Sequence, residues 1–144
     1  TCDILISFNM GETLKPLSKV ASGGEMSRVM LALKTHLFKN KQLSTVIFDE
    51  IDTGMSGAVA EGVAKKLKLM SSSMQVFSIT HLPIVASIAD NHLFVKKSII
   101  DDKTSTDVVE LSFNERVNEI AEMIAPNDTT GKAKEVAALM LNKK

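Results

Sequence analysis

The sequence lacks several features that identify other classes of protein. Its 17 basic and 17 acidic side chains cancel among 144 residues, so it lacks the net positive charge of an autonomous nucleic-acid-binding domain, although a local basic patch is not excluded. Cys2 has no second cysteine with which to form an internal disulfide, which fits a reducing compartment. No apolar run is long enough to span a bilayer, and no signal peptide, repeat or low-complexity segment is visible.

What the sequence does contain is enough apolar character for a folded domain. Apolar side chains make up 44% of the residues, and the length suits one domain with a sizeable core. The first residues already have a strand-like pattern, without a preceding methionine. We therefore expect the chain to be a piece of a longer protein.

The central stretch, residues 45–57, combines a buried-strand pattern with three carboxylates. Residues 46–48 form a continuous apolar run, which is typical of a parallel strand buried on both faces. Asp49, Glu50 and Asp52 follow immediately, at the end of the strand where ligands bind in open α/β sheets. The adjacent acids Asp49 and Glu50 fit nucleotide chemistry, in which one acid holds a magnesium ion and the next polarises a water.

A helix and a second strand follow this stretch. Apolar residues recur at helical spacing up to Met70, and residues 75–80 again read as a strand, so the segment predicts a right-handed βαβ unit. His81 comes directly after the second strand and should emerge at the same sheet edge as the acids. A single histidine is more often structural, as we expect of His36 and His92, but the position of His81 favours a functional role.

Upstream lies a glycine-rich helix start. Ser22 suits an N-cap and Glu25 completes a capping box, with a helix expected to about Lys39. Gly23 and Gly24 would leave backbone N–H groups exposed at the positive end of the helix, where an anion binds well. An ordinary glycine turn with a cap is the alternative.

The flanks predict packing elements without chemistry. We expect a half-exposed strand over residues 4–10, an extended Lys15–Pro16, and a short helix starting at Pro83. Further elements are a hairpin of strands 92–95 and 107–111 and two amphipathic helices, around 117–124 and 133–141. The predicted fold class is α/β: a mainly parallel sheet flanked by helices, with a C-terminal β-hairpin and two helices.

In this order the motifs resemble the second half of an ATP-binding-cassette ATPase head. Residues 21–25 are similar to the signature motif, 46–50 to the Walker B strand, 51–57 to the D-loop and 80–81 to the switch histidine. Glu25, where membrane transporters usually carry glutamine, resembles the SMC-like branch that acts in DNA repair and chromosome maintenance. The longer strings around these motifs, dense over residues 15–97, resemble the bacterial RecN family of double-strand-break repair proteins.

The resemblance implies ATP and Mg²⁺ as cofactors and gives the acids and the histidine their roles. Asp49 would help to hold Mg²⁺, mostly through a water, and Glu50 would orient and deprotonate the attacking water. His81 would bind the γ-phosphate. Asp52 would lie in the D-loop between two heads and count among the nucleotide-binding residues, with a loop-capping acid as the alternative.

For the signature, the resemblance implies a contact across a dimer. Ser22, Gly23 and Gly24, with Glu25 beside them, would face the γ-phosphate of ATP held by a second head. The implied partners are that second head in an ATP-dependent homodimer, the N-terminal Walker A lobe of the same head, and DNA through the full-length protein. The implied location is the bacterial cytoplasm, at the nucleoid, without a membrane partner.

One departure from the family pattern matters. No Gly-x-x-x-x-Gly-Lys-Ser/Thr occurs in the sequence, so the phosphate-cradling loop and its lysine are absent. The resemblance is therefore to the C-terminal lobe alone, without the Walker A lobe and the coiled coil, and we expect the isolated chain to hydrolyse no ATP.

Two alternatives stay open from the residues alone. Residues 49–52, Asp-Glu-Ile-Asp, also fit a helicase Asp-Glu-x-Asp box, although a helicase would not need the Ser-Gly-Gly-Glu helix upstream. The missing phosphate loop also fits a non-catalytic interaction domain.

Overall fold

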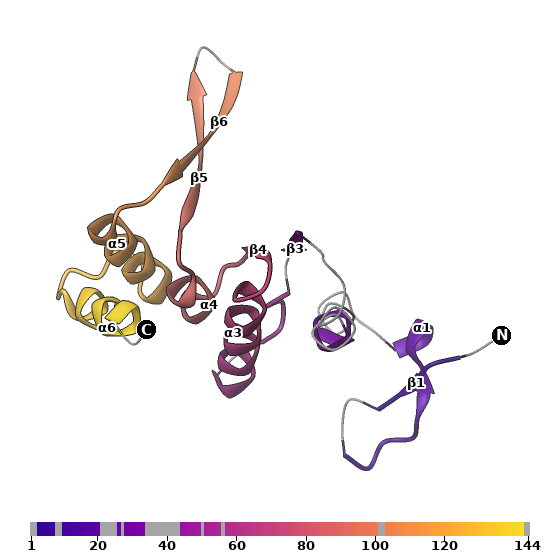
Figure 1. The fold of residues 1–144 in the computed structure, drawn as a ribbon. Helices are drawn as coiled ribbons and strands as arrows, with labels where there is room; N and C mark the ends of the chain where they lie inside the picture. Colours follow the sequence, from indigo (N-terminus) through magenta and orange to yellow (C-terminus); the bar gives the residue numbers. More distant parts are fainter. Residues whose placement is uncertain are drawn as a thin grey trace.

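The computed structural model describes residues 3–7, 10–20, 26, 28–33, 44–49, 51–55, 57–100 and 103–142. From the N-terminus, the elements run from a small antiparallel pair through a parallel βαβ unit to a β-hairpin and two helices (Figure 1). None of the described helices is long and apolar enough to cross a membrane.

The N-terminal pair is shorter than its sequence pattern predicts. β1 (Leu5–Ile6) pairs antiparallel with β2 (Lys15–Pro16), and α1 (Leu17–Val20) follows directly. Met10, predicted to lie within a strand over residues 4–10, is in a turn and fully exposed, so that prediction is wrong in its length. Apolar alternation extends a strand only where a packing surface receives it, and Leu5 is also exposed here.

The centre of the chain is the predicted βαβ unit. β3 (Thr45–Asp49) and β4 (Gln75–Ile79) pair in parallel, and α3 (Gly57–Ser71) connects them. The register runs from Thr45↔Gln75 to Asp49↔Ile79, so the two strands end level with each other.

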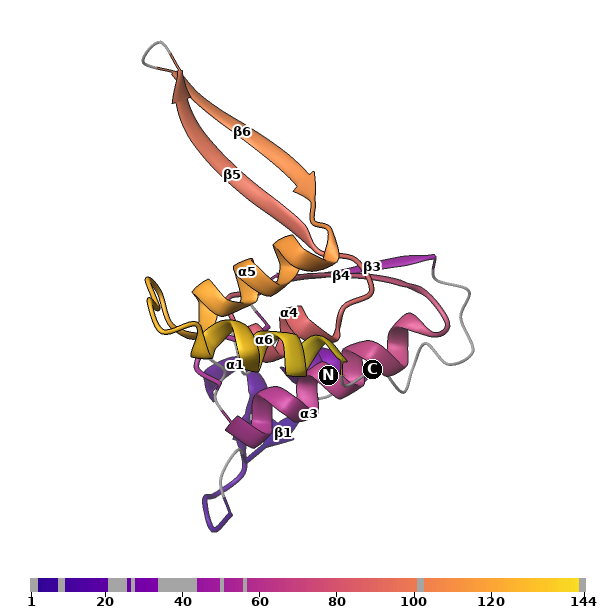
Figure 2. The ribbon, with the colours of Figure 1, turned by 90° about the vertical axis from the view of Figure 1, so that its left-hand side faces the viewer.

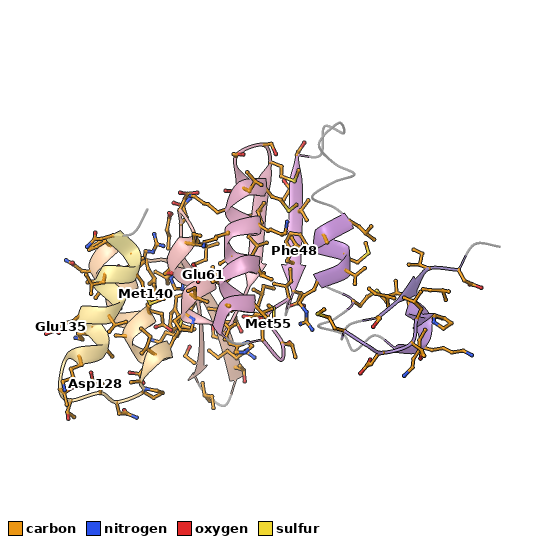
Figure 3. The ribbon with its side chains drawn as sticks, turned by 90° about the horizontal axis from the view of Figure 1, so that it is seen from below. Phe48, Met55, Glu61, Asp128, Glu135 and Met140 are labelled. Carbon is orange, nitrogen blue, oxygen red and sulfur yellow. The ribbon has the colours of Figure 1, made fainter. Side chains whose placement is uncertain are left out.

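One face of this two-stranded sheet packs on α3 to form the larger of two apolar cores. Figure 3 labels Phe48 and Met55, which both lie in this core. The buried members come from β3 and the turn after it, from α3, from the helix of residues 28–33 and from α4 (Pro83–Ile88). They are Leu31, Val46, Phe48, Ile51, Met55, Ala60, Val63, Ala64, Leu67, Met70 and Val85.

The other face of the sheet is exposed, which corrects the prediction of a strand buried on both faces. Val46 and Phe48 are buried, but Ile47 between them is 65% exposed. Its neighbours on β4, Phe77 and Ile79, are 40% and 58% exposed. Successive strand residues point to opposite faces, and α3 buries only the face that carries Val46 and Phe48.

Past α4 the chain forms a hairpin that projects from the helical body (Figures 1 and 2). β5 (Leu93–Ile100) and β6 (Lys103–Glu110) pair antiparallel over eight residues each, well beyond the predicted strands 92–95 and 107–111. The exposed positions in the middle of the hairpin include Lys96 and Thr106, whose polar side chains hide the strand pattern in the sequence.

The two predicted C-terminal helices are confirmed. α5 (Phe113–Ile124) and α6 (Lys132–Asn142) pack on each other and on α4. The second core, between these helices, consists of Ala86, Ile120, Ala121, Ala133, Ala137 and Leu141.

Local hydrogen bonds fix where both helices begin. The N–H and hydroxyl of Ser112 donate to the Glu115 carboxylate at 2.8 and 2.6 Å, and these bonds lower the pKa of Glu115. Before α6, Asp128 accepts hydrogen bonds from the Thr130 hydroxyl and from the Ala133 N–H, at 2.6 and 2.8 Å, and its pKa is lowered.

Ile120 provides a test of the second core. Ile120 is fully buried, so Ile120→Ala should destabilise the chain by about 2 to 5 kcal/mol through lost burial and a residual cavity. Urea unfolding followed by circular dichroism measures this. Leu139→Ala on the exposed side of α6 is the control, with an expected change below about 0.5 kcal/mol. Equal losses for the two variants would contradict the assigned core.

Candidate active site

The carboxyl ends of β3 and β4 form the predicted site edge. Asp49 is the last residue of β3 and pairs with Ile79, the last residue of β4. Thr80 and His81 follow immediately, so Asp49 and His81 emerge at the same edge of the sheet, as predicted. Parallel pairing produces this juxtaposition, since both strands run toward the same side.

A tight turn follows β3 and is anchored in the core on both sides. The Met55 N–H donates to the Asp52 carbonyl at 3.1 Å, and Gly54, the third residue of the turn, has φ +70°. A type II turn needs positive φ at this position, which glycine adopts without strain. Ile51 and Met55 are both buried in the larger core, so the turn cannot shift without disturbing packing.

Asp52 points inward from this turn and binds the segment after β4. Its carboxylate is 0% exposed. Its Oδ2 accepts hydrogen bonds from the Thr80 hydroxyl, from the His81 N–H at 3.0 Å and from the Leu82 N–H at 3.3 Å. The Leu82 N–H also lies 3.0 Å from the Thr80 Oγ1. Burying a carboxylate is costly unless donors surround it, and residues 80–82 supply those donors.

The His81 ring is accessible while its backbone is held. Its side chain is 67% exposed, and its Nδ1 lies 3.5 Å from Asp52 Oδ1. That distance suits an ion pair if the ring is protonated, but it is longer than a hydrogen bond. Oδ1 is enclosed and makes no hydrogen bond to any described residue.

A third segment reaches the same turn. The Arg28 Nη1 donates to the Thr53 carbonyl at 3.2 Å, which ties the helix of residues 28–33 to the turn after β3. Arg28 is not among the predicted site residues, and the contact observed is to the backbone of the turn.

Several predicted site residues lie outside the described part of the chain. These are Ser22, Gly23, Gly24, Glu25 and Glu50, and their roles stay predictions. Asp49 stays a predicted Mg²⁺ residue, because the described residues contain no cluster of three or more acidic, histidine or cysteine side chains that could hold a metal ion. The predicted nucleotide contact of Asp52 also stays a prediction; the contacts observed are those of the alternative, a loop-capping acid.

Sequence reasoning missed the part played by Thr80. Its hydroxyl donates to Asp52, and its oxygen also lies 3.0 Å from the Leu82 N–H, which completes the cap on residues 80–82. Its position in the sequence, directly after a strand and before His81, could have indicated this role.

The other buried charged side chain among the described residues lies elsewhere, between α5 and the turn that enters the hairpin. Arg116 on α5 donates to the carbonyls of Ala89 and Asp90 at 2.8 and 2.9 Å, and burial lowers its pKa. Burial, with the nearby Arg116 charge, also lowers the pKa of His92. The two hydrogen bonds of Arg116 hold α5 against the turn that enters the hairpin, while the structural role expected of His92 stays a prediction.

Comparisons with solved structures identify the class of protein. The Smc head domain of Pyrococcus yayanosii matches with a TM-score of 0.63 and 28% identity, over 78% of this chain and 21% of that chain. A chain from a structural study of ATP-driven dimerization and DNA-stimulated activation of SMC ATPases matches with a TM-score of 0.57 and 26% identity, over 82% of this chain and 70% of that one. The chain therefore has the fold of part of an SMC-type ATPase head.

Sequence comparison identifies the particular relatives. The chain is 50% identical over 137 residues to the DNA repair protein RecN of Bacillus subtilis, and 47% identical over 140 residues to that of Halalkalibacterium halodurans. These matches cover 95% and 97% of this chain but only 24% and 25% of the relatives, so the chain spans about a quarter of their length. No family model matches. The chain corresponds to the C-terminal lobe of a RecN ATPase head.

The cap formed by Asp52 can be tested by hydrogen exchange. Asp52→Ala removes the acceptor of the His81 and Leu82 N–H groups, so both amides should exchange about tenfold faster or more, because hydrogen bonds to charged groups contribute about 1.5–3 kcal/mol. Glu61→Gln, on the exposed side of α3, is the control and should leave both rates unchanged. Unchanged exchange in Asp52→Ala would contradict the cap.

Proposed function

We propose that this chain is half of a composite ATPase. In the longer protein it serves as the C-terminal lobe of an SMC-like head that binds and hydrolyses ATP, acting in DNA double-strand-break repair and recombination at the bacterial nucleoid. The observation that carries the proposal is the shared sheet edge of Asp49 and His81 in a chain this similar to RecN.

At this edge, each group would have a separate task. Asp49 would hold Mg²⁺, mostly through a water, and the ion would neutralise phosphate charge. Glu50, the next residue, would orient and deprotonate the attacking water. His81 would hydrogen-bond the γ-phosphate. Hydrolysis of this kind depends on positioning and charge stabilisation, which suits side chains on paired strand ends.

The signature would act on the other half of a dimer. Ser22, Gly23 and Gly24, with Glu25, would bind the γ-phosphate of ATP held by a second head, because the chain has no phosphate loop of its own. The proposed partners are therefore a second copy of the head and, through the full-length protein, DNA.

The N-terminal lobe of the same head is proposed to cover the open sheet face. Parallel sheets are almost always buried on both sides, yet Ile47, Phe77 and Ile79 stand exposed here. The relatives are about four times longer than this chain, so they contain ample sequence for that cover.

Loss of the general base gives the first test of the proposal. In the full-length protein, Glu50→Gln should retain ATP binding and slow hydrolysis by roughly 10²–10⁴-fold, the usual contribution of a general base. Steady-state ATPase and nucleotide-binding assays measure both quantities, and Asp49→Asn should instead weaken Mg²⁺-dependent binding. Turnover at the parent rate in Glu50→Gln would exclude Glu50 as the base.

The isolated 144-residue chain should hydrolyse no ATP above background, because its sequence contains no phosphate loop.

Mixed dimers test whether the signature acts across heads. Ser22→Arg should block the approach of the partner's γ-phosphate and abolish hydrolysis, while each head still binds ATP at its own phosphate loop. Mixed with a variant changed in the phosphate-loop lysine, it should regain activity, up to about half the parent rate if the two sites act independently. In such a dimer one composite site carries both lesions and the other carries none.

A linked dimer supplies the control for this experiment. With both lesions in one head, each composite site carries one lesion, so activity should stay at the level of a dimer with both sites damaged. If this linked dimer works at about half the parent rate, and the dimer with one lesion in each head is inactive, the signature works within one head.

The open sheet face can be tested by comparing two lengths of protein. Ile47→Ser and Ile79→Ser should change the stability of the isolated chain by less than about 0.5 kcal/mol, because both side chains are already exposed. In the full-length protein each substitution should lower the free energy of unfolding by roughly 2 kcal/mol, which is what burial of such a side chain contributes. Urea unfolding of both proteins measures the difference. Equal tolerance in the two would mean that nothing covers this face.

A further inference from the structure

We infer that Asp52 is a positioning residue that aims the His81 ring, and that it acts on ATP hydrolysis through His81 without touching nucleotide. This inference rests on the proposed function, because it gives His81 a task at the γ-phosphate. It deepens that function by naming what fixes the histidine, and it differs from the nucleotide contact expected for Asp52.

The first support is that the carboxylate itself is immobile. Asp52 is 0% exposed, and the residues on both sides of its turn, Ile51 and Met55, are anchored in the larger core. A charged group in such a place keeps its hydrogen bonds, because breaking them leaves an uncompensated buried charge.

The second support is that this fixed carboxylate determines the backbone at His81. Oδ2 accepts from the Thr80 hydroxyl and from the N–H groups of His81 and Leu82. Residues 80–82 directly follow the last residue of β4. The position from which the His81 ring extends is therefore set by the turn after β3, the strand that also ends in Asp49.

The third support is the second carboxylate oxygen. Oδ1 is enclosed, has no hydrogen bond to a described residue, and lies 3.5 Å from His81 Nδ1. An unpaired buried acceptor is unfavourable, so a small approach of the ring, with Nδ1–H donating to Oδ1, is favoured. That hydrogen bond would fix the proton on Nδ1 and turn Nε2 outward, where the exposed ring meets an incoming phosphate.

The structure disfavours direct binding of nucleotide by Asp52. A ligand would have to displace residues 80–82 to reach a fully enclosed carboxylate. A purely structural role is the remaining alternative, and the orphan oxygen facing the ring argues against it.

Asp52→Asn separates ring orientation from loop support. The amide oxygen can still accept from residues 80–82, while the NH₂ group takes the place of Oδ1 and offers Nδ1 a donor where an acceptor stood. In the full-length protein we expect kcat to fall roughly 10- to 100-fold, KM for ATP to change less than about threefold, and Tm to stay near that of the parent. Asp107→Asn on the exposed hairpin strand is the matched control and should behave like the parent.

A double-mutant cycle with His81→Ala shows whether Asp52 acts through the ring. The double variant should be no slower than His81→Ala alone, since the target of Asp52 is already gone. Multiplied losses would overturn the inference in favour of a structural role, and a loss confined to KM would overturn it in favour of nucleotide contact.

A spectroscopic readout keeps this test independent of the ATPase proposal. With ¹⁵N-labelled histidine in the full-length protein, the parent should show the His81 proton on Nδ1, and Asp52→Asn should move it to Nε2. If the His81 proton stays on Nδ1 in Asp52→Asn, the inference is overturned, whether or not the rate of ATP hydrolysis changes. A shifted ring in a protein whose hydrolysis is insensitive to Glu50→Gln would support the aiming of His81 by Asp52 and refute the proposed function instead.

Discussion

The parallel pairing of β3 and β4 is the constraint on which the rest of this structure depends. Because the two strands run together and end level, with Asp49 opposite Ile79, everything that follows them meets at one edge. α3 completes the crossover and buries one face of the pair. A slip of one residue would turn Val46 and Phe48 out of the core and carry Thr80 away from Asp52, so the packing that fixes the register also assembles the site.

The same pairing leaves the sheet incomplete. Two parallel strands bury little on their own, and the face with Ile47, Phe77 and Ile79 is exposed. The long hairpin also carries exposed apolar side chains. Val95 and Val108 face each other across its strands, and both are exposed. A chain that spans a quarter of its relatives is expected to show such surfaces, because the hydrophobic effect that shaped them acts over the whole protein.

The sequence predicted those elements whose periodicity depends on contacts within the chain. The βαβ unit, α5, α6 and the shared edge of Asp49 and His81 all follow from spacing alone. The exposure of Ile47 could not be predicted, because an apolar run reads the same whether its cover lies inside or outside the chain. The hairpin strands were underestimated because their middle carries lysines and threonines, which an exposed antiparallel pair accepts as readily as a polar loop does.

The buried environment of Asp52 could not be predicted from the sequence, for a physical reason. A carboxylate in a glycine-containing turn normally points to water, and the donors that bury it lie 28 to 30 residues further along the chain. Only the folded register brings them together. Once they meet, exposing either partner would be costly, so the hydrogen bonds of Asp52 hold the turn after β3 against residues 80–82. Under the proposed function, the acids after β3 and His81 would need a constant separation, and the buried charge of Asp52, shared between their two loops, would provide it more firmly than contacts at an exposed surface.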